Sequence, residues 1–156
     1  MHLNENERYE KCRIYENGEA IIVIEKLDKG DIKKEIVLIK KENGEFSFKR
    51  FNNKALNNVS INNIYINENN FEFVINTSKG SYCYDFKTLN QLWKYEGQEV
   101  IHSINTDSNE WILGGRYTTV LAFPNKKVFD PIFASSFDSA ITTTTEYQNK
   151  THNWHS

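Results

Sequence analysis

Residues 59–75 read V-S-I-N-N-I-Y-I-N-E-N-N-F-E-F-V-I, and this stretch decides the fold of the chain. Apolar and polar residues alternate on both sides of the polar N-E-N-N turn, a pattern typical of paired β-strands that each bury one face. S-Y-C-Y-D-F at 81–86 and Q-L-W-K-Y at 91–95 follow after two further turns. The sequence therefore predicts a four-stranded antiparallel unit over 59–95.

The same pattern recurs over 99–129, about forty residues later. Both copies place a polar turn between a pair of isoleucines and an aromatic residue that follows the second isoleucine. The later strands return with a slip of three residues, at L-A-F (121–123) and V-F (128–129). Four short strands in about forty residues is the period of a propeller blade. The matched positions are Ile61 with Ile101, Ile64 with Ile104, Asn69 with Asn109, and Phe71 with Trp111.

The segment Y-D-F-K-T-L-N-Q-L-W-K-Y at 84–95 resembles the last two strands of blades in WD40-like and quinoprotein-like β-propellers. In those families a strand ending in Asp is followed by a turn and by a strand that carries Trp. The resemblance covers about two blades, near half of the chain, and the Gly-His and Trp-Asp pair of WD40 blades is absent. It implies a half-propeller or partial propeller, because a closed ring needs at least four blades. A plain antiparallel meander and a β-sandwich are the alternatives.

The flanking segments add strands to a single all-β domain spanning 1–156. Residues 1–12 are expected to form a lead-in or a first short strand, and a first hairpin unit is expected over 13–51. The polar run at 52–58 separates this unit from the repeat. Within it, residues 32–41 fit both strand and helix spacing, and their β-branched residues favour a strand. A last strand and a polar tail are expected over 130–156.

Composition limits the classes of partner. The net charge is −2, and acidic and basic residues are mixed along the chain, which argues against nucleic acid as the ligand because phosphate binding needs clustered Lys and Arg. The polar N-terminus carries no apolar stretch for a signal peptide or a membrane span, so a cytoplasmic location is expected. Abundant Asn, Ile and Lys beside few Arg suggests a bacterial source.

No residue pattern predicts catalysis, a metal or a cofactor. Cys12 and Cys83 lack metal-ligand spacing, and Cys83 is expected in the core with Tyr82 and Tyr84 facing the other way. No serine lies in a G-x-S-x-G turn, and Gly114 and its neighbour indicate a bulge or a close strand approach, since they lack a phosphate-binding motif. The sequence predicts a non-enzymatic protein.

Aromatic and acidic residues near the turns of the two copies are the candidate partner contacts, because Trp, Tyr and Arg dominate binding hot spots and acids suit a basic partner. We expect a protein-binding module, in its sharpest form a small bacterial immunity protein that blocks the active site of a basic toxin. The alternatives are a subunit of a larger propeller scaffold in which two chains close one ring, and a sugar or small-ligand binder that stacks its ligand on Trp93 or Trp111. The chain itself is expected to be a monomer or a homodimer. The candidate contacts are Glu68, Phe71, Asp107, Glu110, Trp111, Arg116 and Tyr117.

Overall fold

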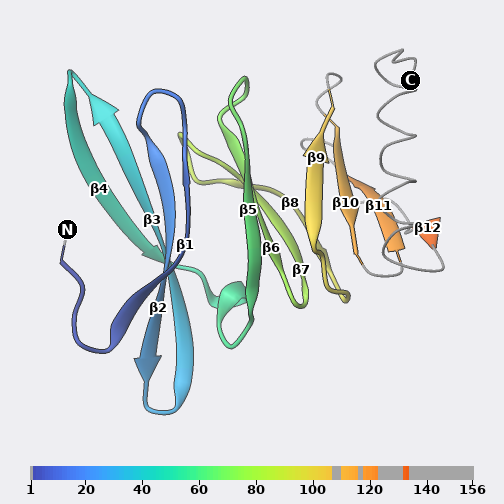
Figure 1. Cartoon of the computed structure of the whole chain (residues 1–156), viewed down its shortest axis with the longest axis horizontal. Helices are drawn as coiled ribbons and strands as arrows, with labels where there is room; N and C mark the ends of the chain where they lie inside the picture. The colour runs from blue at the N-terminus through green and yellow to red at the C-terminus, as the bar shows by residue number, and fades with distance from the viewer. Residues whose placement is uncertain (1, 107–109, 116–117, 123–131, 134–156) are drawn as a thin grey trace.

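The computed structural model describes residues 2–106, 110–115, 118–122 and 132–133, and this part of the chain is all-β. Three four-stranded antiparallel sheets follow one another along the sequence (Figure 1). Each sheet is a meander in which every strand pairs with the next one, so the expected antiparallel meander is confirmed. Sheet 1 contains β1 (Glu7–Ile14), β2 (Ala20–Asp28), β3 (Asp31–Glu42) and β4 (Glu45–Asn52); sheet 2 contains β5 (Ile61–Asn67), β6 (Glu72–Thr77), β7 (Gly80–Asp85) and β8 (Gln91–Glu96); sheet 3 contains β9 (His102–Asn105), β10 (Trp111–Gly114), β11 (Thr118–Ala122) and β12 (Ile132–Phe133).

The sheets stack face to face in chain order, with sheet 2 between sheets 1 and 3 (Figure 1). Their first strands, β1, β5 and β9, lie next to one another. Hydrogen bonds hold this arrangement: Arg13 Nε on β1 donates to the Ile64 carbonyl on β5 at 2.8 Å, and Asn63 Nδ2 on β5 donates at 2.6 Å to the carbonyl of Ile101, which immediately precedes β9. The middle sheet is therefore covered on both faces.

Sheet 1 begins earlier than the expected unit over 13–51, because β1 starts at Glu7 and makes this unit a full four-stranded sheet. Its sequence, E-R-Y-E-K-C-R-I, is largely exposed and charged, and a bulge between Tyr9 and Lys11 interrupts the alternation that would have indicated a strand. The strand interpretation of 32–41 is correct, since β3 pairs with β2 and β4 along its length.

The larger core lies between sheets 1 and 2. Tyr15 packs at its centre, with its ring centroid 4.9 Å from that of Phe86. Leu56, on the short 3-10 helix Lys54–Leu56, fills the same core from within the connector that separates the two sheets. The other buried members are Ile21, Val23, Ile36, Leu38, Ile61, Ile64, Phe73, Ile75, Tyr82 and Tyr84.

A second core joins sheet 2 to sheet 3 and contains Val74, Cys83, Trp93, Val100, Trp111 and Leu113. Cys83 faces sheet 3 while Tyr82 and Tyr84 face sheet 1, so the expected division of β7 into two faces is confirmed. The tyrosines are nevertheless buried as well, because a sheet lies against each face of β7.

The match of positions forty residues apart in the two copies is wrong, because Trp111 corresponds to Phe73 rather than to Phe71. Phe73 on β6 faces the preceding sheet, and Trp111 holds the corresponding inward position on β10, whereas Phe71 lies in the turn before β6. Leu121 and Ala122 of the L-A-F segment belong to the strand Thr118–Ala122, and Ile132–Phe133 pairs with this strand. The strands expected at 128–129 and 140–147 lie outside the described residues.

A buried cation on β3 pairs with acids on β1 and β2, which gives a first prediction. Lys34 is 2% exposed, and its Nζ lies 2.5 Å from a Glu10 oxygen and 2.8 Å from a Glu25 oxygen. Replacing Lys34 with Met leaves two carboxylates without this partner, so we expect the free energy of unfolding to fall by about 3–5 kcal/mol in urea titrations.

The neighbouring Lys33 provides the matched control. Its side chain pairs with Asp28 but is 45% exposed, so Lys33→Met should leave the urea midpoint almost unchanged. Equal midpoints for the two variants would show that the buried ion pairs do not stabilise the sheet.

Candidate functional site

A polar groove of about 580 Å³ lies between sheets 2 and 3, where the β5–β6 turn meets the start of β10. Its lining includes the N-E-N-N turn of the first copy, together with Thr106 and Trp111 from the second copy. Amide, hydroxyl and carboxylate groups dominate its wall. The lining residues are Tyr65, Ile66, Asn67, Glu68, Asn69, Asn70, Ser103, Ile104, Asn105, Thr106 and Trp111.

The N-E-N-N turn is fixed by its own side chains and by sheet 1. Asn67 Oδ1 accepts a hydrogen bond from the Asn69 backbone N–H at 3.0 Å, the Asx turn that asparagine favours. The Glu68 carboxylate accepts the Glu16 backbone N–H at 3.2 Å, which ties this turn to the β1–β2 turn. Phe71 closes the turn with φ of +51°, a left-handed conformation that its packing must stabilise. Glu68 is therefore exposed on a turn with a defined shape.

Phe71 belongs to the core between sheets 1 and 2. Its ring centroid lies 5.6 Å from that of Tyr15, and the Lys87 ammonium lies 5.0 Å from the Phe71 centroid. The side chain is half-buried and packs against the cluster on the sheet 1 side. Its main role in this structure is to anchor the turn that carries Glu68.

Trp111 is buried and 1% exposed, which corrects its expected position as a surface contact. Its indole Nε1 donates to Glu72 Oε2 at 3.1 Å. Trp93 is 4% exposed and packs in the same inter-sheet core. Neither indole offers an open face on which a sugar could stack, because both side chains point into the gap between sheets.

Glu72 is a buried acidic residue that the sequence pattern did not reveal. Burial raises the pKa of its carboxyl, and the Trp111 hydrogen bond offsets part of that effect. Its backbone oxygen accepts a hydrogen bond from the Tyr15 hydroxyl at 2.9 Å. In F-E-F-V-I, an acid between two aromatic residues indicates a solvent-facing position. Only the stacking of sheet 3 on that face buries it.

The asparagines of β5 bind sheet 2 to sheet 3. Asn62 Nδ2 donates to the Val100 carbonyl at 2.9 Å, in parallel with the bond from Asn63 to Ile101. The amides of Asn67 and Asn105 lie 2.9 Å apart on the groove wall. Short polar side chains on this strand thus replace apolar packing along the seam and keep the groove lined with hydrogen-bonding groups.

The remaining sequence candidates lie at the end of the groove or outside the described residues. Glu110 borders the turn before β10, where its N–H donates to Thr106 Oγ1 at 3.2 Å. Asp107, Arg116 and Tyr117 fall outside the described residues. Because the groove presents a carboxylate among amides and hydroxyls, it suits a cationic or hydrogen-bonding side chain better than an anion.

In the ranges that the structure describes, no three His, Cys, Asp or Glu side chains gather in a way that could hold a metal ion. Within the same ranges, no helix has the length and apolar character needed to cross a membrane.

The glycine at 114 is explained by close packing, since a Cβ there would lie 2.1 Å from His102 Nε2. No protein-family model matches the chain, and no curated protein matches its sequence.

The raised pKa of Glu72 predicts a pH dependence of stability. A carboxyl whose pKa is higher in the folded state contributes its full stability below its unfolded pKa and loses it as pH rises through the folded value. Glu72→Gln stays neutral and still offers an oxygen to Trp111. We expect this variant to gain stability relative to the wild type as pH rises through that range, measured as urea midpoints at successive pH values.

Glu96 gives a control of opposite sign. Hydrogen bonds from Lys94 and then Tyr82 lower the pKa of its carboxyl, so its contribution is present at neutral pH and lost as pH falls. Glu96→Gln should therefore lose stability relative to the wild type towards neutral pH. If Glu72→Gln follows the same direction as Glu96→Gln, the Glu72 assignment is wrong.

Proposed function

We propose that the chain is a non-enzymatic protein-binding module, of the inhibitor type that immunity proteins represent, and that it blocks the active site of a basic toxin. The observation that carries this proposal is the polar groove beneath the exposed Glu68 turn. Groove and turn together offer a negative, hydrogen-bonding recess to a cationic side chain of a partner.

The hydrogen bonds that hold the groove together support this role. The side-chain amides of Asn67 and Asn105 join its two walls, and the turn above them is held by Asn67 and by Glu16. A site that is already ordered loses less conformational entropy when it binds, so more of its contact energy appears as affinity. This geometry favours occlusion of a partner's cleft by a preformed surface.

The acidic residues next to the groove also support the proposal. Glu16 and Glu68 meet where the β1–β2 and β5–β6 turns touch, and both residues are exposed. Acidic side chains at an exposed end would guide a basic partner into contact and raise its association rate. A toxin whose cleft binds phosphate has the complementary charge.

Charge reversal at the groove tests the proposal. Tagged wild-type protein, Glu68→Lys and the control Glu45→Lys, an exposed acid on β4, would each be used to capture partners from lysate of the native host. A basic protein should be retained by wild type and control and lost from Glu68→Lys, with a loss of several kcal/mol in calorimetry if Glu68 is buried at the interface.

Toxicity of the captured protein completes the test. Expression of that protein alone should arrest growth, and co-expression with wild-type chain should restore it, whereas co-expression with Glu68→Lys should not. A captured protein that binds Glu68→Lys as tightly as the wild type would reject this groove as the contact surface.

A subunit of a larger propeller scaffold is the second candidate function. It is favoured by three successive four-stranded meanders whose first strands lie next to one another, an arrangement like that of adjacent blades. In this case a second chain would complete the ring. Light scattering that finds only monomer would exclude a ring made from two chains.

A further inference from the structure

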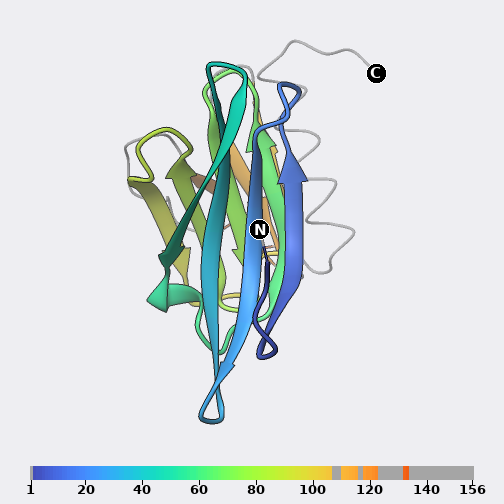
Figure 2. The ribbon, with the colours of Figure 1, turned by 90° about the vertical axis from the view of Figure 1, so that its left-hand side faces the viewer.

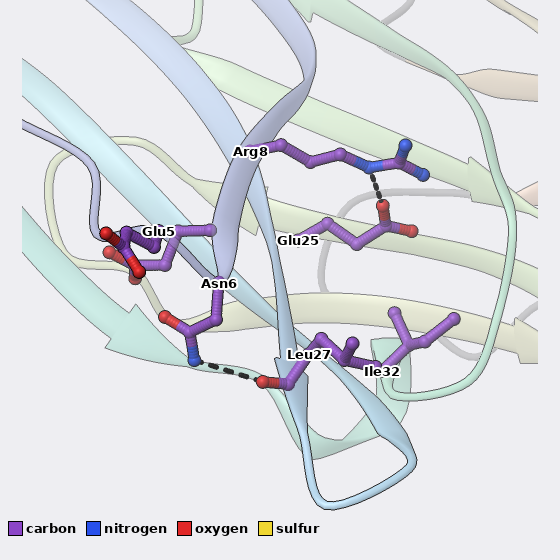
Figure 3. A pocket seen from close by; sticks show the side chains of 7 residues that line it. Glu5, Asn6, Arg8, Glu25, Leu27 and Ile32 are labelled. Atoms are coloured by element: carbon purple, nitrogen blue, oxygen red, sulfur yellow. Dashed lines mark hydrogen bonds and ion pairs between the residues drawn. The ribbon is translucent and has the colours of Figure 1, made fainter.

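The outer face of sheet 1 is the side that points away from sheet 2. It carries apolar side chains of the kind that are usually buried. Strand register places its side chains in three rows that cross all four strands. Figure 2 shows β1 to β4 in the foreground on this side of the molecule. The rows are Ile14, Ala20, Ile39 and Phe48; Cys12, Ile22, Val37 and Arg50; and Tyr9, Ile24, Glu35 and Asn52.

Large apolar side chains remain exposed on this face. Tyr9 is 54% exposed, Ile14 64%, Phe46 50% and Phe48 52%. They surround a small cluster of Ile22, Ile24 and Val37, against which Leu3 and Ile39 pack. By comparison, both faces of sheet 2 are covered by neighbouring sheets. An apolar patch bordered by polar groups marks an interaction surface.

The charges on the outer face cancel. Arg50 pairs with both Glu7 and Glu35, and Lys33 pairs with Asp28. The face therefore has no charge surplus with which to select a strongly acidic or basic partner, and two identical copies can approach without repulsion. This face carries four acidic and four basic side chains: Glu7, Asp28, Asp31 and Glu35, and Lys26, Lys33, Lys41 and Arg50.

We propose that a second copy of this chain covers the outer face of sheet 1, with the two sheets packed face to face about a two-fold axis. A two-fold interface uses the same patch on both copies, which a neutral, apolar surface satisfies. The exposed parts of Tyr9, Ile14, Phe46 and Phe48 supply about 400 Å² of apolar area per copy. That is about half of the 800 Å² per partner in a standard interface, and the polar border supplies the rest.

This proposal does not depend on the groove, which lies between sheets 2 and 3. Dimerisation through sheet 1 would leave the Glu68 turn open to a partner. Failure of one proposal therefore leaves the other standing.

Sedimentation velocity over about a hundredfold range of protein concentration tests the dimer. We expect wild-type protein to move from monomer to dimer as concentration rises. Phe48→Glu should raise the dissociation constant at least about thirtyfold, because it places a charge in an apolar interface. The matched control is Leu27→Glu, since Leu27 is 60% exposed but lies on the opposite face of β2, and this variant should dimerise like the wild type.

Wild-type protein that stays monomeric throughout the range would overturn the proposal. So would a Phe48→Glu variant that dimerises normally, or a Leu27→Glu variant that dissociates equally. Circular dichroism of each variant would confirm that the sheets are intact.

Cys12 distinguishes face-to-face pairing from ring closure. It is exposed within the middle row of the outer face, whereas Cys83 is buried and serves as an internal control. In the face-to-face dimer both Cys12 thiols lie in one interface, so a bismaleimide of about 15 Å, the width of four strands, should link the two chains. In a two-chain ring the thiols would lie in separate interfaces, about three stacked sheets or 30 Å apart.

A covalent dimer that disappears in Cys12→Ser would support the face-to-face arrangement. A non-covalent dimer that the reagent never links would overturn it in favour of the ring.

Discussion

Burial of sheet 2 on both faces is the constraint on which the structure depends, and Glu72 is where it acts most directly. Its carbonyl oxygen accepts the Tyr15 hydroxyl from the sheet 1 side, and its carboxylate accepts the Trp111 indole from sheet 3. One residue thus connects all three sheets. A buried carboxyl is costly unless it is hydrogen-bonded, so the position of Trp111 is set by the need to satisfy this group as well as by apolar packing.

Other buried polar side chains between sheets 2 and 3 are also hydrogen-bonded. Asn76 is fully buried, and its Oδ1 accepts hydrogen bonds from Ser81 at 2.6 Å and from Ser103 at 2.9 Å. The Ser103 bond joins β9 to β6, and the amides of Asn62 and Asn63 join β5 to the two residues that precede β9. The groove opens where this polar seam reaches the turns, so its lining of amides and hydroxyls is a consequence of how the two sheets are joined.

The molecule presents two surfaces of different chemistry. The groove end is polar and carries exposed acids at Glu16 and Glu68, which suits a charged partner. The outer face of sheet 1 is apolar and electrically balanced, which suits a second surface like itself. Because they lie on different sheets, the chain can present the groove to another protein while sheet 1 is covered.

The sequence by itself determined the all-β class, the strands of sheet 2 and the opposite facing of Cys83 and its tyrosine neighbours, because alternation and turn residues are local signals. The sequence also predicted the N-E-N-N turn and indicated Glu68 within it as a candidate contact. Only the tertiary structure decided that Trp111 is buried, that Glu72 faces sheet 3, and that β1 completes sheet 1. Burial on a second face depends on which sheet stacks there, and residues far apart in the chain supply that sheet, so a local pattern does not encode it.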